Sequence, residues 1–149
     1  MLFRSYVREY LTFAGSLHGV KNLKSRVEEV IKLVGLTPEA HKPIQQLSKG
    51  YRQRVGLAQA IIHDPEVLIL DEPTSGLDPN QIADIREIII QMGKEKTVLL
   101  STHIMQEVEA MCSRVVIISK GNVVANAPVN ELTASDQKLE QVFKELTTK

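Results

Sequence analysis

Residues 68–78 read LILDEPTSGLD, an apolar run that ends in two adjacent carboxylates, Asp71 and Glu72. A short apolar run of this kind is typical of a buried strand, and ligands of open parallel sheets gather where the strands end. An Asp in that place typically holds Mg²⁺, while a neighbouring Glu can take a proton from an attacking water. Because Pro73 follows, we expect an extended Glu72 whose carboxylate points away from that of Asp71. On this stretch alone, acidic residues that merely solvate a strand end remain the alternative.

The residues around this run alternate between strands and helices. Further apolar runs at 97–101 and 114–119 predict strands, and the segments 80–93 and 104–112 have helical periodicity. Strand, helix, strand, helix and strand in succession predict a parallel sheet with right-handed crossovers. The residues expected to face inward on the first of these helices are Ile82, Ile85, Ile89 and Met92. A hairpin turn with a short strand at 120–127 and a helix at 135–149 complete the second half.

The first half of the chain is predicted to be helical. Apolar positions recur at helical spacing in 5–19 and 25–35, Thr37 and Pro38 predict a short helical turn, and a helix that Ser48 caps continues to about residue 63. Asp64 and Pro65 stop that helix. We therefore place the domain boundary here, with a helical subdomain at 1–63 and a strand-containing part at 64–149.

Composition limits the classes of partner and compartment. The 18 basic residues balance 18 acidic ones, so no net field attracts the chain to nucleic acid or anionic lipid. The single Cys112 cannot form an internal disulfide, and no paired Cys/His spacing indicates zinc, which suits a reducing compartment. No run of eighteen apolar residues and no signal-peptide core occurs. We expect a soluble chain that is compatible with a place beside a membrane.

Three stretches in order, at 47–62, 67–72 and 99–105, resemble the ATP-binding subunits of ABC transporters. LSKGY at 47–51 is similar to the signature motif and VLILDE at 67–72 to Walker B; SGLD at 75–78 is similar to the D-loop, and His103 to the switch histidine. The resemblance covers nearly the whole chain. It implies an α/β fold, namely part of a P-loop NTPase (RecA-like) parallel-sheet core plus an ABC helical subdomain. The wording LSKGYRQRVG further resembles subunits that serve ABC-2-type exporters, including the gliding-motility kind.

The resemblance implies a role for each motif residue. Asp71 would hold Mg²⁺ bound with ATP, Glu72 would be the general base, and His103 would contact the γ-phosphate. The signature residues, which would face a nucleotide held by the other subunit of a head-to-tail dimer, are Ser48, Lys49, Gly50 and Tyr51. The D-loop residues, which would lie at the dimer seam, are Ser75, Gly76, Leu77 and Asp78.

Each of these motif residues also has a purely structural interpretation. Ser48 caps a helix whose N–H groups favour anions, and Gly50 permits close approach, yet Ser is also an ordinary N-cap. Likewise, His103 can be a loop histidine bonded to backbone, and Asp78 can cap the next helix. Lys49 stands where the family usually has glycine and either reaches phosphate or solvates the helix start. Tyr51 replaces the usual glutamine, which leaves a polar contact from that position in question.

The phosphate loop GxxxxGK[ST] does not occur in the sequence. The nearest candidate, Gly93 followed by Lys94, has Ile88 and Glu95 where the first glycine and the hydroxyl residue are needed. We therefore expect the C-terminal part of an ATP-binding subunit, with the phosphate loop before Met1, and a chain that is inactive alone. Its sheet would leave apolar faces and an open edge, and such surfaces favour association.

Three functions fit these expectations. In the first, the chain is part of an ATPase subunit on the inner face of the cell membrane that powers an integral-membrane permease, with the helical half contacting that permease. In the second, it is a non-catalytic, degenerate ATP-binding module that only docks on a permease or an intact ATPase. The third, a soluble ABC ATPase of translation or DNA repair, usually adds a second cassette, a long coiled coil or a basic surface. The neutral, short chain shows none of these, and no nucleic-acid partner is expected.

Overall fold

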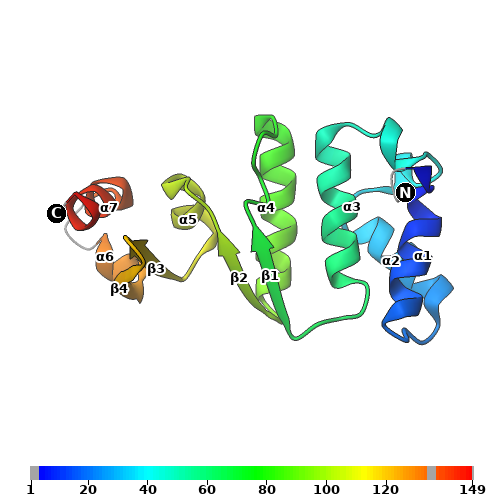
Figure 1. Cartoon of the computed structure of the whole chain (residues 1–149), viewed down its shortest axis with the longest axis horizontal. Helices are drawn as coiled ribbons and strands as arrows, with labels where there is room; N and C mark the ends of the chain where they lie inside the picture. Colours follow the sequence, from blue (N-terminus) through cyan, green and yellow to red (C-terminus); the bar gives the residue numbers. More distant parts are fainter. Residues whose placement is uncertain (1–3, 134–136, 149) are drawn as a thin grey trace. The chain divides into compact units, whose positions relative to one another are not determined.

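The computed structural model describes residues 4–133 and 137–148. The chain forms two compact units, Met1–Leu100 and Ser101–Lys149. Each unit has its own strands and helices, and each is described by itself below (Figure 1). None of the helices within the described ranges has the length and apolar character that crossing a membrane requires.

The first unit begins with helices, as predicted. They are α1 (Val7–Leu17), α2 (Leu23–Leu33), the short 3-10 turns η2 (Thr37–Glu39) and η3 (Ile44–Gln46), and α3 (Lys49–Ile61). Their apolar stripes pack into one core whose fully buried members include Val7, Leu11, Val30, Val34, Leu36, Ala58 and Ile62. The predicted Ser48 cap is confirmed, since the Ser48 hydroxyl accepts a hydrogen bond from the Tyr51 N–H at 3.3 Å.

A strand, a helix and a second strand follow in the first unit. They are β1 (Val67–Asp71), α4 (Pro79–Gly93) and β2 (Thr97–Ser101), whose last residue already belongs to the second unit. β1 and β2 are adjacent and run in the same direction (Figure 1). Ile85, Ile89 and Met92 are buried on α4 as predicted, while Ile82 is half-buried. The crossover helix therefore holds its predicted face against the core.

The second unit contains a hairpin between helices. Its elements are α5 (Met105–Met111), β3 (Arg114–Ser119), β4 (Asn122–Pro128), α6 (Val129–Leu132) and α7 (Leu139–Thr147). β3 and β4 pair antiparallel from Arg114 opposite Pro128 to Ser119 opposite Asn122. Between them Lys120 and Gly121 both have positive φ, at 50° and 79°, as a two-residue hairpin turn requires. The predicted hairpin at 120–127 is thus confirmed.

The predicted place of the third apolar run is wrong. We expected 114–119 to extend the parallel sheet, but among the described residues β3 pairs only with β4, in a two-stranded sheet of its own. A two-residue turn brings β4 directly alongside β3, and local pairing of this kind needs no crossover. The predicted C-terminal helix is found as α7, although residues 134–136 and 149 lie outside the described residues. The functional boundary predicted near Asp64 stays a prediction.

Candidate functional site

The two carboxylates lie where β1 ends. Asp71 is the last residue of the strand and is exposed, and the half-buried Glu72 opens a tight turn. The Ser75 N–H donates to the Glu72 carbonyl oxygen at 3.1 Å and closes this turn. Pro73 and Thr74 at its corner are buried, with Thr74 only 2% exposed. The chain therefore reverses immediately after Asp71, and the carboxylates stand at the carboxyl end of a strand, as predicted.

The predicted extended backbone of Glu72 is wrong. Its φ is 43°, in the left-handed region, and it is one of the few described non-glycine residues with positive φ. A side chain costs about 1–2 kcal/mol in that region. The preference of a pre-proline residue for extended backbone gives way here because Pro73 and Thr74 are held in the core by the turn. Left-handed, strained residues of this kind concentrate at functional sites.

The first turn of α3 packs against the residues that follow Glu72. Gly50 is buried, and a Cβ added to it would lie 2.6 Å from the Gln81 side chain on α4. Lys49 extends over Gly76, whose φ of 68° and lack of a side chain make room for the Lys49 amine. The lack of a side chain at Gly50 therefore serves packing within the chain. Phosphate approach at this helix end stays a prediction.

The D-loop residues lead directly into α4. Asp78 caps that helix, and its carboxylate accepts hydrogen bonds from the N–H groups of Asn80 and Gln81, both at 3.0 Å. The structural interpretation of Asp78 is thus confirmed. The predicted place of Ser75, Gly76, Leu77 and Asp78 at a dimer seam stays a prediction.

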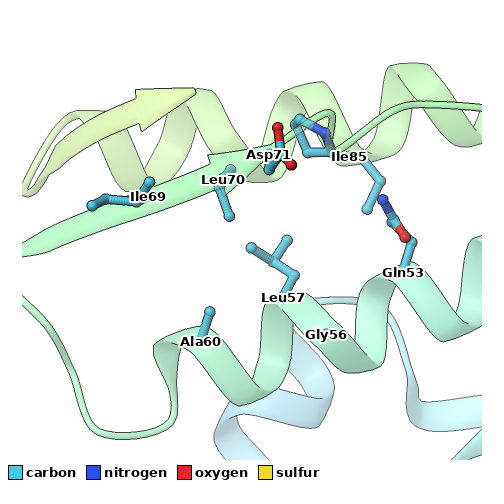
Figure 2. Close-up of a pocket in the computed structure, with 9 residues that line it drawn as sticks. Gln53, Gly56, Leu57, Ala60, Ile69, Leu70, Asp71 and Ile85 are labelled. Atoms are coloured by element: carbon cyan, nitrogen blue, oxygen red, sulfur yellow. The ribbon is translucent and has the colours of Figure 1, made fainter. Parts of the chain in front are cut away.

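A cavity of about 230 Å³ opens between α3 and β1. Its lining consists of Gln53, Gly56, Leu57, Ala60, Ile69, Leu70, Asp71, Pro73 and Ile85 (Figure 2). Gln53 rises from α3 toward the end of β1, and its amide donates to the Glu72 carbonyl oxygen at 3.4 Å. The cavity is thus apolar along its length and polar at the end that carries Asp71.

Sequence reasoning missed Arg54, which ties three segments together. Its side chain is buried, and its guanidinium donates to the Val34 carbonyl oxygen at 3.0 Å and to the Asp84 carboxylate at 2.6 Å. The guanidinium also lies 5.8 Å from the centre of the Tyr51 ring, within cation–π range. A signal was present, because Arg54 stands four residues after Gly50 on the buried stripe of α3.

The segment after β2 is held by a polar turn. Thr102 accepts from the Ile104 N–H at 3.1 Å and donates to the Glu107 carboxylate at 3.2 Å, and Glu107 is only 2% exposed. These bonds fix the start of α5 in the second unit. His103 lies inside this turn and is exposed. Its predicted place at the same sheet edge as Glu72 stays a prediction, as does its contact with the γ-phosphate.

The donor groups fit a magnesium ion only when a nucleotide supplies further ligands. Among the described residues no cluster of three or more His, Cys, Asp or Glu side chains could hold a metal by itself. Mg²⁺ in nucleotide sites typically takes one or two protein carboxylates together with phosphate oxygens. An exposed carboxylate at a strand end, as Asp71 provides, meets that requirement.

The strand β1 ends at Asp71 and leads through Glu72 into a turn, and the capped helix that carries LSKGY lies beside it. Together these features indicate the class of ABC-type ATP-binding proteins. The family model described as "ABC transporter" matches residues 2–75. The chain belongs to this family, as the motifs predicted, and the α/β fold with part of a P-loop NTPase core is confirmed.

Three curated relatives illustrate the similarity. The uncharacterized ABC transporter ATP-binding protein YhcH of Bacillus subtilis is 44% identical over 82% of this chain and 40% of the relative. The ABC transporter ATP-binding protein NatA of the same organism is 38% identical over 90% of this chain and 56% of the relative. The bacitracin transport ATP-binding protein BcrA of Bacillus licheniformis is 38% identical, over 88% and 43%. The chain thus spans about half the length of these relatives.

Solved structures agree with this assignment. A structure described as the ATP-binding subunit of an ABC transporter superposes with a TM-score of 0.83 at 28% identity, over 100% of this chain and 65% of that one. The cbiO1 protein of Clostridium perfringens, part of the ABC transporter complex cbiONQ, gives a TM-score of 0.80 at 31% identity, over 95% and 58%. The resemblance to the ABC-2-type exporter and gliding-motility subtype stays a prediction.

Proposed function

We propose that this chain acts as the C-terminal part of an ATP-hydrolysing ABC transporter subunit that couples ATP hydrolysis to transport through a membrane permease. One observation carries the proposal. The strand end with Asp71 and Glu72 and the first turns of α3 lie against each other within one compact unit, joined by the bond from Gln53 to Glu72. The proposed hydrolysis site and the proposed signature helix would then be parts of one body, which suits a subunit that contributes to two nucleotide sites.

The roles of the residues follow from their positions. Asp71, exposed at the strand end, would bind Mg²⁺ together with ATP. Bound there, the ion would offset the negative charge that the phosphates carry. Glu72 follows Asp71 and would take the proton of the attacking water, and His103 would orient that water beside the γ-phosphate. Function as a general base requires Glu72 to be held in one orientation, and the bond from the Ser75 N–H fixes the backbone from which its side chain extends.

The signature residues would serve the second nucleotide site. Ser48, Lys49, Gly50 and Tyr51 occupy the N-terminal end of a thirteen-residue helix, and such ends favour phosphate through their N–H groups and the helix dipole. We propose that this end faces ATP bound by the other subunit of a head-to-tail dimer, with the D-loop at the seam. The helical part, 1–63, would contact the permease. The subunit would then lie in the cytoplasm against the membrane, without a nucleic-acid partner.

We further propose that the 149-residue chain alone does not hydrolyse ATP. Its sequence lacks the loop that cradles the β- and γ-phosphates in this class. The exposed apolar side chains Val67 and Ile69 on β1 and Leu99 on β2, with Ile69 70% exposed, support a covering segment on this face of the sheet. Asp71 shares that face with Val67 and Ile69 because strand side chains alternate.

Equilibrium binding of Mg·ATP to the purified chain tests this proposal, with the oligomeric state read by light scattering in the same sample. We expect no saturable binding, because one carboxylate and a helix end do not replace a phosphate loop. Tight binding would mean that another phosphate-binding site exists among these residues and that the proposed roles are wrong.

A further inference from the structure

Between α3 and the residues that follow β1, three contacts join positions that stand far apart in the sequence. Lys49 lies over Gly76, Gly50 packs on Gln81, and the Gln53 amide donates to the Glu72 carbonyl. Only the last reaches the residue that carries the base, and it reaches the backbone of that residue.

We infer that Gln53 is a positioning residue. It holds the backbone of Glu72 in the left-handed conformation and so sets the direction in which the Glu72 carboxylate points. This inference rests on the role proposed for Glu72. It also extends that role, because Gln53 stands on the helix whose first turn carries the signature residues. Any shift of α3 that accompanies nucleotide contact at Ser48 would reach the Glu72 turn through the Gln53 side chain.

The geometry of the turn explains why one amide matters. The Glu72 carbonyl oxygen accepts two hydrogen bonds, from the Ser75 N–H inside the turn at 3.1 Å and from Gln53 outside it at 3.4 Å. A residue with φ of 43° tends to return to negative φ unless its surroundings hold it. The Ser75 bond closes the turn locally, whereas the Gln53 bond ties the turn to a helix that is itself packed in the core.

The place of Gln53 on α3 brings its side chain beside the end of β1. It is half-buried on α3 and lines the cavity beside Asp71 and Pro73, so its side chain lies along the wall that leads to the strand end (Figure 2). Gln59 on the same helix offers a matched comparison. It is exposed and accepts a hydrogen bond from the Tyr10 hydroxyl, with no part in the turn.

The first test uses amide hydrogen exchange in the 149-residue chain, which needs no ATP. We compare two variants, Gln53→Met and Gln53→Glu, with the control Gln59→Met. Gln53→Glu keeps the side-chain length but replaces the hydrogen-bond donor with an acceptor. Loss of one hydrogen bond should make the Ser75 and Leu77 amides exchange about two- to tenfold faster in both Gln53 variants. In both Gln53 variants the amides of α1 should exchange at the wild-type rate. In Gln59→Met the Ser75 and Leu77 amides should exchange at the wild-type rate.

The second test measures steady-state ATP hydrolysis by the complete subunit with the same variants. A displaced base should lower kcat about tenfold in Gln53→Glu while KM for ATP stays within about twofold, because ground-state binding does not use Glu72. Unchanged exchange in the turn would overturn the inference, and so would faster exchange with unchanged kcat. A wild-type subunit without turnover would instead refute the proposed function, and the exchange result would still decide whether Gln53 holds the turn.

Discussion

Replacing the buried arginine of α3, Arg54→Met, should destabilise the first unit by about 2–3 kcal/mol. Methionine keeps most of the apolar volume of the arginine stem, so the loss comes from the guanidinium. The Val34 carbonyl, on a fully buried residue, loses the donor that lies 3.0 Å away, and leaving a buried acceptor unsatisfied costs about 1–3 kcal/mol. The Asp84 side chain is 60% exposed, so losing its ion pair adds about 1 kcal/mol or less.

The assay is urea unfolding followed by far-ultraviolet circular dichroism, because the chain contains no tryptophan for fluorescence. In a thermal scan the same loss should lower Tm by about 5–10 °C. Arg52→Met is the matched control, since Arg52 is exposed two residues earlier on the same helix and bonds only locally to the Leu47 carbonyl. Asp84→Asn should cost about 1 kcal/mol or less, which separates the ion pair from the bond to Val34.

A loss below about 0.5 kcal/mol for Arg54→Met, no larger than that for Arg52→Met, would refute this reasoning. It would mean that the hydrogen bond from Arg54 to the Val34 carbonyl, which links α3 to the end of α2, contributes little to the free energy of unfolding. Equal losses for Arg54→Met and Asp84→Asn would place the whole effect in the ion pair instead.

Three further predictions concern other parts of the chain. Asp78→Ala removes both capping bonds of α4 and should cost about 1 kcal/mol in the same unfolding assay, whereas a loss near zero would deny the cap its role. Ile69→Lys should reduce self-association in light scattering, because it places a charge on the exposed apolar face of β1; an unchanged molecular mass would exclude that face as the contact. Burial, reinforced by the Glu107 carboxylate, raises the pKa of the Cys112 thiol, so native chain should react with iodoacetamide more slowly than urea-unfolded chain. The difference between the two reaction rates should shrink as pH rises through the pKa of Cys112 in the folded chain. Equal rates at neutral pH would contradict a raised pKa in the native chain.

Local signals made much of the fold predictable. Ser48 and Asp78 each begin a helix, and a capping side chain acts on N–H groups two or three residues away, so the sequence alone contains both partners. The hairpin after residue 119 was predictable for the same reason, since its turn residues stand together. The family followed from motifs whose order and spacing agree over nearly the whole chain.

Features that depend on distant partners were not predictable. Arg54 bonds to residues 20 and 30 positions away, so its partners could not be found from the sequence around it, even though its place on the buried stripe of α3 indicated burial. The pairing of β3 was mispredicted because an apolar run does not specify its neighbour, and an adjacent hairpin strand competes directly with a crossover. Glu72 was expected to be extended because a pre-proline preference is a local average, and the buried corner of the turn outweighs it.

The most direct test of the central claim, that Glu72 is the catalytic base of an ABC-type ATPase, is ATP turnover by the complete subunit with Glu72→Gln. Glu66→Gln serves as the control, because Glu66 is an exposed carboxylate that immediately precedes β1. We predict that Glu72→Gln retains Mg·ATP binding and loses turnover by at least about a hundredfold, while Glu66→Gln keeps both. Wild-type turnover in Glu72→Gln would contradict the account.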